Sequence, residues 1–197
     1  MIFKLFVLAA VSVIGVHSQI NLGQLFEDDN GTRSVQAPDQ FQVIMETNVD
    51  RGAACPLVLN VTRSLAPNST DIFWSMVTSS PAVFEQSAFY SVVAGSYAEF
   101  GISGDPTRNS LESTKTIEYD TPQMPNLRGT VSLKTLPYQT LGLQAVINLH
   151  DNSMFDAVKM APFAKVIAHP CAPFHRILGT AVQHPCLVQK MCSVADP

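Results

Sequence analysis

Short runs in which apolar and polar residues alternate recur along most of this chain. Alternation with a period of two is typical of strands that bury one face of a sheet. The clearest runs are Phe41–Glu46 and Pro56–Thr62, where Leu57, Leu59 and Val61 fall on one face. Five further apolar runs lie at 89–93, 129–133, 144–149, 163–168 and 187–194. A chain built from so many short strands is expected to be mainly β.

Two segments carry the spacing of a helix instead. Asn68-Ser-Thr-Asp71 offers N-cap candidates before an apolar stripe at Ile72, Phe73, Met76 and Val77. Pro173–Gln183 has a similar stripe, although Gly179 weakens it. The polar stretch from Gly104 to Asn126 contains three prolines and is expected to be a surface loop. Many short strands with two helices favour a closed or nearly closed barrel, since closure removes exposed strand edges.

The first eighteen residues are typical of a secretory signal peptide. Lys4 precedes an apolar stretch from Leu5 to Val16, and the small residues Val16 and Ser18 favour cleavage before Gln19. The stretch holds 12 residues, whereas a membrane span needs about 20. We therefore expect a signal peptide at 1–18, a polar leader at 19–38 and a folded domain at 39–197. The mature protein is expected to be secreted, with no membrane anchor after signal cleavage.

Composition excludes some partners. The chain carries 12 basic and 16 acidic residues, for a net charge of −4, and it has no long run of one charge. A general nucleic-acid binder would show a basic face, so nucleic acid is not expected as a partner. With 46% hydrophobic and 14% charged residues, the chain is expected to fold around a core. We expect it to be a monomer.

The sequons and cysteines fit an oxidising, secretory compartment. Three N-x-Ser/Thr sequons mark Asn30, Asn60 and Asn68 as glycosylation candidates. The four cysteines are disulfide candidates, and three pairings are possible: Cys55, Cys171, Cys186 and Cys192. Two His-Pro-Cys triplets, at His169 and His184, raise zinc as an alternative. Their spacing matches no zinc-finger pattern, so we expect disulfides and no metal or cofactor.

A series of short motifs, read in order, is more informative than composition. They are Phe41-Gln-Val-Ile, Ala66-Pro-Asn-Ser-Thr-Asp-Ile-Phe-Trp-Ser-Met-Val, Phe89-Tyr-Ser-Val-Val-Ala-Gly, Phe100-Gly-Ile-Ser-Gly-Asp-Pro, Asn126-Leu-Arg-Gly-Thr-Val-Ser, Gln144-Ala-Val-Ile-Asn-Leu-His-Asp-Asn and Ala161-Pro-Phe-Ala-Lys-Val-Ile. This series resembles the cyclophilin-type peptidyl-prolyl cis-trans isomerases, as a divergent and secreted member would. The resemblance covers residues 41 to about 168.

The resemblance implies an eight-stranded antiparallel β-barrel capped by two α-helices. It also implies an open groove that binds proline-containing protein or peptide segments. In the family, an arginine donates a hydrogen bond to the prolyl nitrogen and so weakens the double-bond character of the peptide C–N bond. The rotation has a barrier of about 18–20 kcal/mol in the absence of an enzyme. No nucleophile, metal or cofactor takes part.

At these positions the sequence departs from the family. The run that begins at Phe89 has Ser91 where the family arginine stands, and Glu99 replaces a substrate-binding glutamine. The second family glutamine is kept as Gln144, but the two phenylalanines after it are replaced by Ala145 and Val146. The family's large aromatic residue aligns with Met154, beside Phe155. The resemblance therefore places the substrate groove at Phe89, Ser91, Glu99, Gln144, Ala145, Val146, Met154 and Phe155.

Two functions follow from these observations. The first is a secreted cyclophilin-type peptidyl-prolyl isomerase that acts on or binds X-Pro segments, with weakened catalysis because Ser91 is short and neutral. The alternative is a catalytically inactive cyclophilin-fold module with a binding or structural role outside the cell. Arg108 or Lys134 could replace the arginine by reaching into the groove, and the sequence leaves this open.

Overall fold

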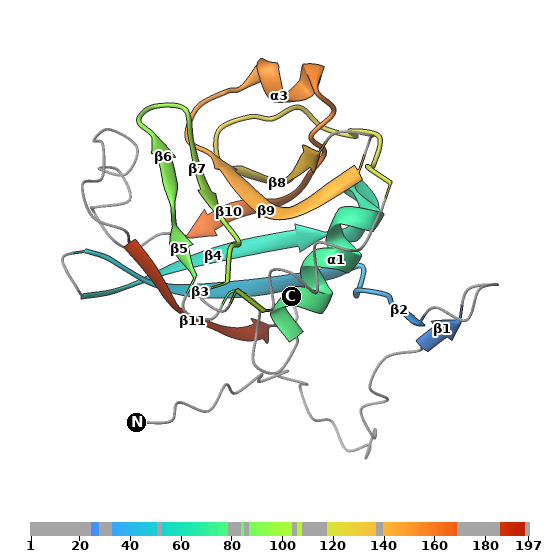
Figure 1. Ribbon diagram of the computed structural model, residues 1–197, viewed down its shortest axis with the longest axis horizontal. Coiled ribbons are helices and arrows are strands. Elements are labelled where there is room, and N and C mark those ends of the chain that lie inside the picture. Colours follow the sequence, from blue (N-terminus) through green and yellow to red (C-terminus); the bar gives the residue numbers. More distant parts are fainter. Residues whose placement is uncertain are drawn as a thin grey trace, which may run out of the picture.

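The alternating runs of the sequence form an antiparallel sheet around a single core (Figure 1). The computed structural model describes residues 25–27, 33–50, 53–78, 84, 87–103, 106–107, 118–136, 140–168 and 186–195. The strands are β1 (Leu25–Glu27), β2 (Arg33–Val35), β3 (Gln40–Asp50), β4 (Ala53–Thr62), β5 (Ala88–Phe89), β6 (Ser91–Val93), β7 (Tyr97–Phe100), β8 (Thr130–Leu136), β9 (Thr140–Asn148), β10 (Pro162–Ala168) and β11 (Cys186–Ala195). The helices are α1 (Pro67–Thr78), α3 (Ser153–Ala157) and a 3-10 turn at Arg63–Leu65.

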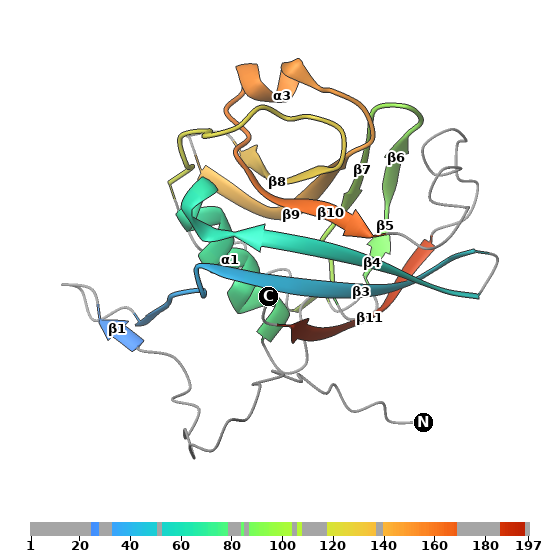
Figure 2. The same cartoon turned by 180° about the vertical axis from the view of Figure 1, so that it is seen from behind.

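Nine of these strands form one sheet in the order β5-β11-β3-β4-β10-β8-β9-β7-β6. The two ends of this order, β5 and β6, are separated along the chain only by Tyr90, whose N–H donates to the Glu99 carbonyl at 3.1 Å. Figures 1 and 2 show the sheet curling around the core. The mainly β prediction is confirmed. The eight-stranded count is approximate. The sheet is not a closed ring, because β5 pairs with β11 and β6 pairs with β7, but β5 and β6 follow one another along the chain and do not pair.

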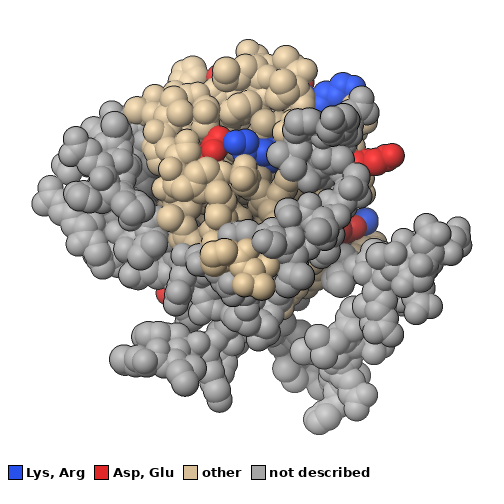
Figure 3. All heavy atoms as spheres, in the orientation of Figure 1, with Lys and Arg blue, Asp and Glu red and all other residues tan. Residues whose placement is uncertain are grey.

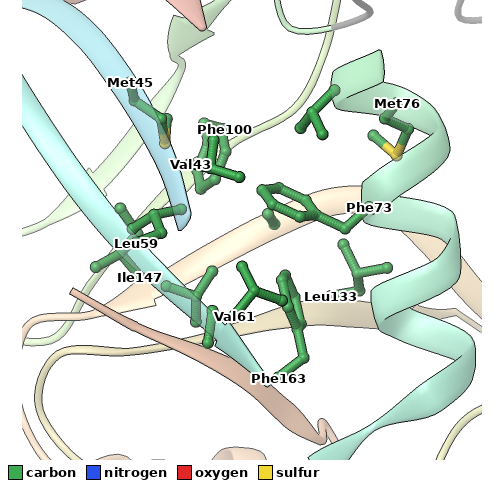
Figure 4. Packing of buried hydrophobic residues seen from close by; sticks show 14 of the residues in the cluster. Val43, Met45, Leu59, Val61, Phe73, Met76, Phe100, Leu133, Ile147 and Phe163 are labelled. Atoms are coloured by element: carbon green, nitrogen blue, oxygen red, sulfur yellow. The ribbon is translucent and has the colours of Figure 1, made fainter. Parts of the chain in front are cut away.

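The core lies inside the curled sheet, against α1 (Figure 4). Alternation along β3 buries Phe41, Val43 and Met45, and alternation along β4 buries Leu57, Leu59 and Val61. A chain of aromatic contacts runs through this core, with ring centroids 4.9–5.6 Å apart: Phe163, Phe73, Phe84, Phe100 and Phe89. Pairs of this kind contribute about 0.5–1.5 kcal/mol each beyond the area they bury.

Helix α1 carries the apolar stripe that its sequence predicts, with Ile72, Phe73, Met76 and Val77 buried. Its start differs from the expected N-cap, because the helix already begins at Pro67, a residue suited to the first helical position. The capping group comes from a distant loop. The Asp120 carboxylate accepts bonds from the Asn68 and Ser69 N–H groups at 2.9 and 2.8 Å and from the Ser69 hydroxyl at 2.6 Å.

Replacing Asp120 with alanine is expected to lower the free energy of unfolding by about 2 kcal/mol, because the first turn of α1 loses its acceptor. Urea denaturation of the folded protein measures this change. Thr121→Ala is the matched control, since Thr121 is the exposed neighbour in the same loop. Equal losses in the two variants would show that Asp120 does not cap the helix.

Two further predictions concern the C-terminal part of the chain. The last predicted strand is confirmed as β11, whereas the helix predicted at 173–183 lies outside the described residues. Helix α3 was not predicted.

Part of the expected polar leader is tied to the domain: Ala37 is buried in the core, and its N–H donates to Asp71 Oδ1 at 2.8 Å. Asp71 also receives a bidentate pair from Arg63, at 2.8 and 2.9 Å.

The processing sites are only partly described. Asn68 is exposed at the start of α1, and Asn60 is half-buried on β4. Asn30 and Cys171 lie outside the described residues, and for Cys55, Cys186 and Cys192 only the strand backbone is described, so the disulfides stay a prediction. Within the described ranges, no cluster of three His, Cys, Asp or Glu suited to a metal is found, and no helix has the length and apolarity to cross a membrane.

Candidate functional site

Strands β6, β7, β9 and β8 lie side by side and present two opposite faces. On one face, neighbouring residues such as Ala98, Ile147 and Val131 belong to the core cluster. We call the opposite side the outer face. A cross-strand row on the outer face is fixed by the pairing register and contains Ser91, Glu99, Val146 and Ser132. Ser91 and Glu99 are directly opposite one another, so the two family positions that sequence comparison singled out meet on this face.

Glu99 is the charged centre of the outer face. It is 8% exposed, and its Oε1 receives a bond from Lys134 Nζ at 3.0 Å. The phenol of Tyr90 lies within the influence of the Glu99 charge. Burial, followed by the charge of Glu99, raises the pKa of Tyr90 above its ordinary value of 10.0, so the phenol stays protonated and remains a donor. Figure 3 shows an adjoining acidic and basic side chain within a mostly uncharged surface.

The predicted groove positions divide between the two faces, because strand residues alternate. Val146 and Gln144 lie on the outer face, while Ala145 belongs to the core cluster. Phe89 also packs into the core, with its ring 5.6 Å from that of Phe100. Of the two residues that replace the family phenylalanines, only Val146 therefore lies on the outer side of the sheet, where it is 1% exposed.

An aromatic pair borders Val146. Tyr97 lies two residues before Glu99 on the same face, and its ring centroid is 5.2 Å from that of Phe155 in α3. Met154 is 61% exposed and has no such contact among the described rings. Sequence reasoning named Phe155 but missed Tyr97, although the two-residue spacing from Glu99 was a usable signal. Together Tyr97 and Phe155 offer apolar surface on which a proline ring could pack, beside the buried Val146.

Three buried asparagines hold α3 beside the outer face. Asn126 is the hub: its Oδ1 accepts from Ser132 Oγ at 2.7 Å and Asn148 Nδ2 at 3.0 Å, and its Nδ2 donates to Asp156 Oδ1 at 2.8 Å. The same Nδ2 donates to the Met160 carbonyl at 2.7 Å. Asn152 Nδ2 donates to Asn148 Oδ1 at 2.8 Å, which joins the third asparagine to the others. The three asparagines lie within the family-like motifs, but no local spacing in the sequence predicts that they meet.

The comparisons bear on the fold. No protein-family model matches the sequence, and no curated protein matches it. Solved structures do match. A cyclophilin-type peptidyl-prolyl cis-trans isomerase of Cryptosporidium parvum has a TM-score of 0.58 and 16% identity, covering 78% of this chain and 96% of its own. The Mimivirus cyclophilin has a TM-score of 0.57 and 13% identity, covering 83% and 92%.

A second structure of the Cryptosporidium protein, determined in the presence of the dipeptide Ala-Pro, has a TM-score of 0.56 and 15% identity, covering 77% of this chain and 97% of that one. All three structures match this chain over more than three quarters of its length. The chain therefore has a cyclophilin-like fold, and identities this low support the fold alone.

Proposed function

We propose that this chain is a secreted cyclophilin-fold protein that binds X-Pro segments on its outer face and isomerises them poorly. The observation that carries the proposal is the placement of Ser91 directly opposite Glu99 on that face. By resemblance, Ser91 takes the place of the arginine that donates to the prolyl nitrogen. A serine hydroxyl is short and neutral, so it does not supply the charged donor that the family chemistry uses.

The size of the catalytic loss follows from comparable sites. Removing one donor aimed at a transition state costs about 10²–10³ in rate. Lys134 is a cation on the outer face, but its ammonium is already bonded to Glu99 at 3.0 Å. The alternative that Lys134 replaces the arginine would require this ion pair to open, and Arg108 lies outside the described residues. These contacts favour binding over turnover.

Binding of proline has support of its own. Tyr97 and Phe155 supply apolar surface beside the Ser91–Glu99 pair. Aromatic side chains contribute large contact areas, so this surface partly replaces the aromatic residues that the sequence lacks. A structural neighbour was solved in the presence of Ala-Pro, which makes this dipeptide a suitable first probe.

A second candidate function is a binding or structural module with no isomerase activity. The Glu99–Lys134 ion pair favours it, because both charged groups of the outer face are satisfied within the protein. The secretory setting in either case is proposed from residues 1–18 and the three sequons. Of the sequons, Asn68 is exposed at the start of α1, with its amide nitrogen donating to the Glu118 carbonyl at 3.2 Å.

Exchange NMR on a short Ala-Pro peptide tests the proposal, with mature protein starting at Gln19. We expect catalysed exchange about 10²–10³ slower than for an arginine-bearing cyclophilin under the same conditions. Ser91→Arg alone is expected to restore little, because Glu99 stands opposite and would pair with the new guanidinium. Ser91→Arg with Glu99→Gln is the matched variant that removes this pairing. Exchange by the unaltered protein at the rate of the arginine-bearing enzyme would contradict the proposal.

A further inference from the structure

The ion pair between Glu99 and Lys134 spans an intervening strand. Glu99 lies on β7 and Lys134 on β8, and β9 lies between these two strands in the sheet. Neighbouring strands are about 4.8 Å apart, so the two backbones are separated by about 10 Å. An ammonium–carboxylate distance of 3.0 Å therefore requires both side chains to extend over the outer face of β9.

The register identifies what lies beneath this bridge. Glu99 pairs with Val146, which in turn pairs with Ser132, and Lys134 follows Ser132 by two residues on β8. The bridge thus crosses β9 on the Gln144 side of Val146, where the β8–β9 register shifts between Leu133 and Thr135. Val146 is 1% exposed although it lies on the outer face and is not part of the core cluster. A valine on the side of a sheet away from the core needs another cover. The buried Asn126, which bonds Ser132 and Asn148, borders Val146 on one side, and the bridge lies toward Gln144 on the other.

The two ends of the bridge are buried to different extents. Glu99 has 11% of its side chain exposed, while Lys134 has 32% exposed. The long apolar stem of a lysine can cover an apolar neighbour while its ammonium stays at the surface. The acidic end is thus the more buried one, and the lysine end is the one that can swing away.

We propose that the Glu99–Lys134 pair is a built-in cover that closes Val146 to ligands on the outer face. In the closed state Val146 is unavailable, and X-Pro segments meet only the Tyr97–Phe155 edge. When the Lys134 side chain moves away from Glu99, Val146 becomes accessible beside the Tyr97–Phe155 edge. The part of this inference that concerns X-Pro ligands rests on the proposed function, whereas the covering of Val146 does not.

The test compares Lys134→Ala with Lys165→Ala in the full mature protein. Lys165 is the matched control because it is an exposed strand lysine on β10, away from Val146. A soluble paramagnetic agent reports how exposed the Val146 methyl groups are, and titration with an Ala-Pro peptide reports affinity. We expect Lys134→Ala to raise the paramagnetic relaxation of Val146 several-fold and to tighten peptide binding about tenfold, with neither change in the control.

The outcomes separate the two proposals. If Lys134→Ala leaves the paramagnetic relaxation of Val146 unchanged, the proposed cover is overturned, regardless of any change in peptide affinity. A rise in relaxation together with tighter binding would support both proposals. A rise in relaxation with no peptide binding by either protein would support the cover and refute X-Pro binding as the function. Circular dichroism of each variant confirms that the sheet is kept.

Discussion

Gly101→Ala is expected to lower the free energy of unfolding by about 3 kcal/mol, the sum of a steric and a backbone penalty. Gly101 follows β7 with φ +105, a conformation that side chains rarely adopt. An added Cβ would lie 2.7 Å from the Leu143 carbonyl oxygen, 3.0 Å from Phe84 Cε1 and 3.2 Å from the Ala145 nitrogen. Two of these atoms belong to the backbone of β9, so relief requires the strands beside the outer face to move.

Gly95→Ala separates the two penalties. Gly95 also has a positive φ, +69, but nothing lies within 4 Å of its added Cβ. We expect a loss of about 1 kcal/mol there, from backbone conformation alone. Urea denaturation of both variants gives the difference. If Gly95→Ala cost as much as Gly101→Ala, the close approach of Gly101 to β9 would not be the cause.

Asn126→Ala is expected to cost about 3 kcal/mol, because it removes a buried hub and leaves several polar groups without their partner. Ser132 and Asn148 lose an acceptor, and the Met160 carbonyl loses a donor. The loss should also release α3, so the ring contact between Tyr97 and Phe155 should weaken. The aromatic NMR signals of these two residues report that second effect.

The control for the asparagine hub is Gln123→Ala. Gln123 is an exposed amide in the same loop and makes one local bond, to the Thr121 carbonyl at 3.2 Å. Its loss should change the free energy of unfolding by less than about 0.5 kcal/mol. An Asn126→Ala protein as stable as this control, with unchanged Tyr97 and Phe155 signals, would show that the asparagines do not position α3.

Much of the fold could be predicted from sequence because strand and helix patterns are local. Alternation at Phe41, Val43 and Met45 is enough to predict β3, and the stripe on Phe73 and Met76 is enough to predict α1. Helix α3 could not be found this way. It has five residues and no buried side chain, and the contacts of Asn126 and Asn152 hold it in place. Those contacts join residues far apart in sequence.

The candidate site could be predicted in part. The order of motifs placed Ser91 and Glu99 at family positions, and the register puts them opposite one another. The same reasoning grouped Ala145 with Val146, whereas strand alternation separates them. The bridge to Lys134 depends on the order β7-β9-β8, which no local pattern contains. Long-range strand order is therefore the information about this site that could not be predicted from local sequence patterns.

The most direct test of the central claim is a titration of isotope-labelled mature protein with a short Ala-Pro peptide, followed by NMR. The claim is that the outer face of β6, β7, β9 and β8 is where X-Pro segments bind. We expect saturable shifts at Tyr97 and Phe155, with smaller shifts at Ser91 and Glu99, and none at Asn60 on the outer side of β4. No saturable shift at Tyr97 or Phe155, or shifts centred on β4, would contradict it.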